Sequence, residues 1–120
     1  MNPQVREKWT TRLRSGQDEQ GTARLHQVTG EKCCLGVLCE IAFEEGVVPR
    51  VTREDEIAYG QEVRFNTLPQ EVIEWAGIRS EIGHLRNPVD GWFTLVALND
   101  SAGWDFQRIA DVIEQNGDQL

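Results

Sequence analysis

Apolar residues recur at helical spacing directly after the start of the chain. Asn2 and Pro3 precede three apolar positions that are four residues apart, and Gly16 follows the last of them. Asparagine supplies a capping oxygen to a helix, and the fixed backbone angle of proline suits the first helical position. The pattern therefore predicts a first helix that begins at Pro3 and ends before Gly16.

The most apolar stretch begins at Cys33 and reaches Phe43, and acidic residues follow before Gly46. Because this stretch is apolar on nearly all sides for two turns, it predicts a helix at the centre of the fold. Glycine inside a helix costs about 1 kcal/mol relative to alanine. Gly36 is therefore expected to mark either the helix start or a close crossing with another element.

Two further helices are predicted in the second half of the chain. Residues 67–77 carry a proline near the start and a glycine at the end, with apolar residues between them. Asp105 is placed to cap a helix whose apolar residues follow at i, i+3, i+4 and i+7 from Phe106 to Ile113. A short turn around Leu95 to Leu98 and a structural loop from Asn99 to Gly103 are expected before that helix.

Alternation of apolar and polar residues predicts a β-hairpin from Ile57 to Phe65, with Gly60 and Gln61 in its turn. A shorter hairpin is expected between residues 22–28 and 31–34, whereas residues 78–91 show no regular pattern. Together these elements predict an α+β fold. It would be a small, mainly helical single domain with about four helices around the central apolar helix and one or two short hairpins.

Length and hydropathy indicate one domain that does not cross a membrane. A chain of 120 residues has the usual size of one domain, so residues 1–120 are expected to share a single core. The longest apolar run, Cys33 to Cys39, is far below the roughly 20 residues that a membrane-spanning helix needs. The first residues lack the apolar segment of a secretory signal. A cytoplasmic location is the expectation.

The charge of the chain is unevenly distributed. The formal net charge is -8, and residues 1–32 contain six basic and four acidic side chains, so the excess of acidic residues lies after residue 32. Negative charge repels phosphate groups, so direct binding to nucleic acid is not expected. A partner protein with a basic surface would be attracted instead. The alternative is that the charge serves solubility alone.

Three cysteines, Cys33, Cys34 and Cys39, could suggest a metal site or a nucleophile. An odd number of cysteines without an export signal favours reduced thiols over disulfides. The spacing does not match a zinc knuckle, and on a helix Cys34 and Cys39 lie about 140° apart. Buried structural thiols are therefore the preferred interpretation, and we expect no cofactor, metal ion or catalytic residue.

Two pairs of carboxylates occur at helical spacing, Glu40 with Glu44 and Glu71 with Glu74. General acid catalysis requires a carboxyl group in a pocket that raises its pKa. Both pairs are predicted on the polar sides of their helices, so we expect all four side chains to be solvated.

Other side chains are candidates for binding a partner. Trp92 and Trp104 follow glycines in less regular stretches, where an exposed indole would indicate a binding surface. The run Glu54-Asp55-Glu56 would face a basic partner, with solubility as the alternative. Arg12 and Arg14 form a small basic patch, which is either a solvated helix face or the lining of a pocket for an anionic ligand.

Several motifs together are similar to a family of small uncharacterised proteins encoded by bacteriophages and bacteria, often as accessory genes. The most specific is Cys33-Cys34-Leu35-Gly36-Val37-Leu38-Cys39. The others are Leu13-Arg14-Ser15-Gly16 with Gln20-Gly21, Leu68-Pro69, Trp75-Ala76-Gly77, Leu98-Asn99-Asp100 and the stretch Phe106 to Ile113. The resemblance implies no activity or cofactor, but it favours a phage accessory protein that acts on a host component.

We expect a non-enzymatic accessory protein that binds a host factor and inhibits or sequesters it. The surface of the host factor that it contacts would be basic, and the chain itself would be a monomer or homodimer. One alternative is a module that binds a small ligand or sequesters a nucleotide. The other is an enzyme with an unrecognised site.

Overall fold

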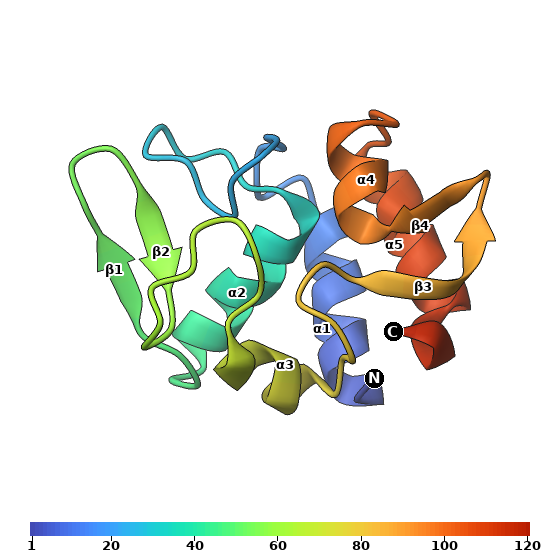
Figure 1. Cartoon of the computed structure of the whole chain (residues 1–120), viewed down its shortest axis with the longest axis horizontal. Coiled ribbons are helices and arrows are strands. Elements are labelled where there is room, and N and C mark those ends of the chain that lie inside the picture. The colour runs from blue at the N-terminus through green and yellow to red at the C-terminus, as the bar shows by residue number, and fades with distance from the viewer.

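Helix α2, Cys34–Glu44, lies at the centre of the structure, with the other elements arranged around it (Figure 1). The computed structural model describes all residues from 1 to 120. The remaining elements are α1 (Pro3–Arg14), β1 (Arg50–Thr52), β2 (Ile57–Tyr59), α3 (Gln70–Ala76), β3 (His84–Val89), β4 (Trp92–Thr94), α4 (Leu95–Asp100), α5 (Phe106–Gln115) and the 3₁₀ turn η1 (Gly117–Gln119). This is an α+β domain with five α-helices and two separate two-stranded antiparallel sheets, as the pattern predicted in outline.

Helix α1 confirms the predicted cap. The side-chain oxygen of Asn2 accepts hydrogen bonds from the main-chain N–H groups of Gln4, at 2.9 Å, and Val5, at 3.2 Å. The apolar side of α1 packs against α5 and α2. The indole N–H of Trp9 is buried and donates to the carbonyl oxygen of Cys34 at 2.9 Å, which anchors the start of α2 to α1.

Helix α2 is buried from Cys34 to Ala42, so the prediction of a central helix is confirmed. Gly36 faces the main chain of Leu25, and a Cβ at this position would overlap the Leu25 carbonyl group. The glycine therefore allows the loop before α2 to cross the helix at backbone contact.

The first hairpin forms with a different partner from the predicted one. Strand β2 pairs with β1, which precedes it, and Val51 lies opposite Ala58. The segment from Val63 to Phe65, which was predicted as the second strand, forms only an isolated bridge. In this bridge Tyr59 and Arg64 exchange two main-chain hydrogen bonds. Val63 has a φ of 57°, a left-handed conformation that does not continue a strand.

The prediction of a hairpin between residues 22–28 and 31–34 is also wrong, because neither segment forms a strand. A turn does occur there, because the Gly30 N–H donates to the Gln27 carbonyl oxygen at 2.9 Å. However, His26 pairs with Lys32 and with Ile57 through isolated bridges only. The segment is a loop that lies along the edge of β2.

Residues 78–91 were expected to be irregular, and the structure corrects this, because residues 84–89 form β3, which pairs with β4. The turn between them is Asp90-Gly91, and both residues have positive φ angles, 50° and 83°. Aspartate followed by glycine is a strong hairpin signal that the apolar pattern alone did not weigh. The two hairpins lie at opposite ends of the molecule (Figure 1).

The remaining helices follow the prediction closely. Helix α3 ends at Gly77, whose φ is 68°, and the side chain of Asp105 accepts from the Arg108 N–H at 2.9 Å at the start of α5. The predicted turn at Leu95 to Leu98 is a complete short helix, because the Thr94 side chain caps it. No helix reaches the length and apolar character needed to cross a membrane.

Candidate functional site

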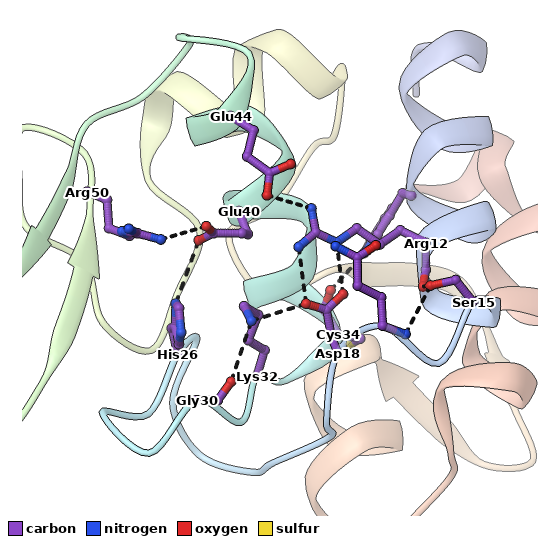
Figure 2. Close-up of polar contacts among 12 residues, drawn as sticks. Arg12, Ser15, Asp18, His26, Gly30, Lys32, Cys34, Glu40, Glu44 and Arg50 are labelled. Atoms are coloured by element: carbon purple, nitrogen blue, oxygen red, sulfur yellow. Dashed lines mark hydrogen bonds and ion pairs between the residues drawn. The ribbon is translucent and has the colours of Figure 1, made fainter.

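A buried polar cluster joins α2 to the first hairpin and to the loop before α2. It comprises Glu40 of α2, Arg50 of β1, Tyr59 of β2 and His26 of the loop. The Tyr59 hydroxyl donates to Glu40 Oε2 at 2.5 Å and lies 2.8 Å from His26 Nδ1, while Arg50 donates to Glu40 Oε1 at 2.6 Å. Figure 2 shows the Glu40 carboxylate between Arg50 and His26.

Glu40 was predicted to be solvated, and this prediction is wrong, because its residue exposure is only 7%. Helix periodicity correctly places Glu40 and Glu44 on one side of α2, but β1, β2 and the loop cover the part of that side that carries Glu40. A buried carboxylate requires donors, and Tyr59 and Arg50 supply them.

Burial sets the protonation states within this cluster. It raises the pKa of Tyr59, and the hydrogen bond to Glu40 adds to the effect, so the hydroxyl keeps its proton and donates it to the carboxylate. Burial also lowers the pKa of His26, and Lys32 and Arg50 lower it further, although Glu40 acts in the opposite direction. Since Tyr59 donates to Glu40, the neutral His26 ring donates from Nδ1 to the tyrosine oxygen.

A second set of ion pairs continues from this cluster toward α1. Arg12 contacts Asp18 at 2.8 Å and Glu44 at 2.9 Å, and Lys32 contacts the other Asp18 oxygen at 3.1 Å (Figure 2). Burial alone would raise the pKa of Asp18, but the hydrogen bonds from Arg12 and Lys32 outweigh it and hold the pKa below its ordinary value. Arg12 is thus already neutralised by two carboxylates.

Arg14 does not share the surroundings of Arg12. It contacts Asp111 at 2.8 Å and Glu114 at 2.5 Å, both on α5. The largest hollow, of about 700 Å³, runs along α1 and is lined by polar side chains that include Arg12 and Lys8. Lys8 is paired with Glu45 at 2.9 Å, so this hollow offers an anionic ligand no unpaired cation.

The three acidic residues at the tip of the β1–β2 hairpin differ in their surroundings. Glu56 pairs with Arg53 at 3.3 Å and with Arg24 at 3.5 Å. Glu54 and Asp55 are exposed, and no basic side chain lies within ion-pair distance of either one. The free negative charge of the tip therefore resides on Glu54 and Asp55.

A shallow groove of about 350 Å³ lies between this tip and the loop before α2. We call it the 22–29 groove, and it is lined by Thr22, Ala23, Arg24, Gln27, Val28, Thr29 and Asp55. Val28 is 50% exposed, and Arg24 stacks over the ring of Phe65, which is 37% exposed. The buried cluster positions this groove, because His26 lies between the lining residues Arg24 and Gln27 and points inward.

A smaller hollow of about 270 Å³ adjoins the groove and contains Trp104. It is lined by Gln20, Thr22, Asn99, Gly103, Trp104 and Asp105, so Thr22 belongs to both depressions. The guanidinium of Arg108 lies 3.4 Å from the centre of the Trp104 ring and covers it. Trp92 is half-buried on β4 and packs against the core, in neither hollow.

Asn99, at the bottom of this smaller hollow, has a structural role. Its side-chain oxygen accepts from the Gln20 side chain at 2.9 Å and from the Cys34 N–H at 3.2 Å. Its amide nitrogen donates to the Gly21 carbonyl oxygen and to Asp100. The buried amide is fully hydrogen-bonded and joins α4 to the loop and to the start of α2.

The three cysteines are buried free thiols. Burial raises the pKa of Cys33 to about 11 and raises that of Cys34 and Cys39 as well. A thiol with a raised pKa is a poor nucleophile. No three or more His, Cys, Asp or Glu side chains are grouped so that they could hold a metal ion.

The structure thus brings two predicted residues, Asp55 and Trp104, to adjoining hollows, and it separates Trp92, Arg12 and Arg14 from them. His26, Tyr59 and Val28 were not predicted as site residues. The alternation of apolar and polar residues around Tyr59 indicated that its side chain faces inward. No sequence pattern near His26 indicated that it would lie beside Glu40.

Comparison with known proteins agrees with the resemblance to an uncharacterised family. Neither the curated proteins nor the solved structures contain a match to the chain. A family model described as a domain of unknown function (DUF8296) matches residues 1–117. The chain therefore belongs to this family.

Proposed function

We propose that the chain is a non-enzymatic accessory protein of phage type, which binds a host protein in the cytoplasm through a basic surface of that protein and so inhibits or sequesters it. The observation that carries the proposal is the unpaired negative charge of Glu54 and Asp55 beside the 22–29 groove. The phage setting is supported by the resemblance of the cysteine-rich motif and its companions.

The distribution of ion pairs favours a basic partner over an anionic ligand. Most of the twelve lysine and arginine side chains are engaged by carboxylates of the same chain, among them Arg12, Arg14 and Arg24. The net charge of -8 is therefore displayed by acidic groups that lack such partners. Charge of this kind attracts a basic surface and speeds encounter with it.

The interior supports binding better than catalysis. The buried cluster of Glu40, Tyr59, His26 and Arg50 resembles an acid–base relay, but its groups satisfy one another, and none of them lines a hollow. A general acid or base must reach its substrate within hydrogen-bond distance. The cluster instead holds the loop that carries the groove.

Affinity capture from a lysate of the host tests this proposal. Three baits should be compared: the wild-type chain, the double variant Glu54→Gln with Asp55→Asn, and the double variant Glu74→Gln with Asp118→Asn. The third bait removes two charges from exposed carboxylates that also lack ion-pair partners but lie elsewhere.

We expect the wild-type and control baits to retain the same basic protein at low salt, and the tip variant to retain much less of it. Recovery should fall for all baits as salt rises, since exposed charges are screened. Equal recovery with all three baits, or enrichment of acidic proteins only, would contradict the proposal.

A further inference from the structure

We infer that the 22–29 groove binds an extended segment of the partner in which a lysine or arginine lies next to an apolar residue. The inference rests on the proposed function, because it names the part of the partner that the acidic tip attracts. Three separate features of the groove support it.

The first feature is exposed apolar surface. The chain exposes three large hydrophobic side chains: Val28 lines the groove, Phe65 lies under the guanidinium of the lining residue Arg24, and Phe93 lies on β4 of the other hairpin. Val28 and Ala23 give the groove an apolar part, whereas the hollow along α1 has none. Apolar surface that is exposed in a depression and rimmed by polar residues is suited to contact with an apolar group of a partner.

The second feature is the charge at the rim. Asp55 lines the groove without a cation beside it, and Glu54 precedes it at the tip. Arg24 is the one basic residue of the lining, and it is occupied by Glu56 and by the ring of Phe65. The charge that remains available to a ligand is the negative charge of Asp55 and Glu54, and it favours binding of a cationic side chain.

The third feature is free main-chain donors. The N–H groups of Val28 and Thr29 make no hydrogen bond within the chain, in contrast to the neighbouring Gln27 and Gly30. Carbonyl oxygens of an extended segment are natural acceptors for such groups. Thr22 lines both this groove and the hollow with Trp104, so a segment that extends past Thr22 would enter that hollow.

Titration of the isotope-labelled full-length chain with short peptides, followed by nuclear magnetic resonance, tests the inference without the natural partner. The probe is a blocked hexapeptide of alternating arginine and leucine. Two comparison peptides replace arginine by glutamate or leucine by serine. Each is titrated into wild type, Asp55→Asn, Val28→Ser and the control Glu74→Gln.

The arginine–leucine peptide should shift the amide resonances of Val28, Thr29 and Asp55 most strongly. The glutamate peptide should leave them in place, and the serine peptide should bind more weakly. We expect Asp55→Asn and Val28→Ser each to weaken binding about five-fold, whereas Glu74→Gln should leave it unchanged. Val28 and Asp55 are exposed, so we expect both variants to keep the fold. Spectra recorded without peptide, compared with that of wild type, check this.

Two results would overturn the inference: no shift with the arginine–leucine peptide, or shifts that centre on Phe93 or on the α1 hollow. Either result leaves the proposed function standing if host capture still depends on Glu54 and Asp55. Conversely, peptide binding in the groove without any captured host protein would refute the host-directed function while supporting the groove as a site for basic segments.

Discussion

Gly36 of helix α2 faces the main-chain carbonyl group of Leu25 at backbone contact. No side chain fits between them, so the loop that carries the 22–29 groove is pressed directly against the central helix. The position of the groove is in this way linked to the packing of α2.

Replacement of Gly36 by alanine tests this contact. Alanine favours helix formation by about 1 kcal/mol, but its Cβ would overlap the main chain of Leu25, which cannot move as a flexible side chain can. Overpacking of this kind costs about 1–3 kcal/mol or more, so we expect a net loss of unfolding free energy in a denaturant titration. Stability equal to or above that of wild type would show that the crossing is loose.

The central position of α2 predicts a large difference between two of its residues. Leu38 is fully buried, so Leu38→Ala should lower the free energy of unfolding by about 2–5 kcal/mol. Glu44 is exposed and makes one ion pair with Arg12, so Glu44→Ala should cost no more than about 1 kcal/mol. Equal shifts of the denaturant midpoint would contradict the central role of the helix.

Tyr59 and Glu40 should be energetically coupled. Tyr59→Phe removes a donor from a buried carboxylate and an acceptor from His26, at a cost of about 1–3 kcal/mol. Because the two residues share one hydrogen bond, the double variant with Glu40→Gln should differ from the sum of the single variants by about 0.5–3 kcal/mol. A double-mutant cycle measures this coupling, and strict additivity would indicate that the bond contributes nothing.

The buried histidine predicts a pH dependence of stability. The pKa of His26 is lowered by burial from its ordinary value of 6.5, so the unfolded chain binds this proton more readily than the folded chain. The stability contributed by neutral His26 is therefore complete above pH 6.5 and is lost as the pH falls below that value.

Denaturant titrations between about pH 7.5 and pH 5 check this dependence. His26→Gln should flatten the decline of stability just below pH 6.5, and His84→Gln, which alters the exposed histidine, should not. If both variants follow the wild-type curve, His26 is not the group responsible.

Local sequence patterns predicted the elements whose stability depends on near neighbours. The cap at Asn2, the apolar periodicity of α5 and the uniformly apolar α2 each act within a few residues, and all three agree with the structure. The errors concern partners far apart in the chain. Alternation around Ile57 indicated a strand but could not choose between the strand before it and the segment after it.

The same distinction applies to the candidate site. Exposure of Glu54 and Asp55 followed from their place in a charged turn, whereas the burial of Glu40 depends on Arg50, Tyr59 and His26 folding over it. Helical periodicity assigns a side chain to one side of a helix but does not say which turn of that side another element covers. The groove itself is formed by segments that only the tertiary structure brings together.

The most direct test of binding through the acidic tip is the association rate of the captured host protein, measured with wild type and with the Glu54→Gln, Asp55→Asn variant. Glu56 is left unchanged, because it is engaged by Arg24 and Arg53. The proposal predicts that the variant associates more slowly and with a flatter dependence on salt, while its dissociation rate stays nearly the same. Association that is insensitive to salt and to the two substitutions would show that the acidic tip does not attract the partner.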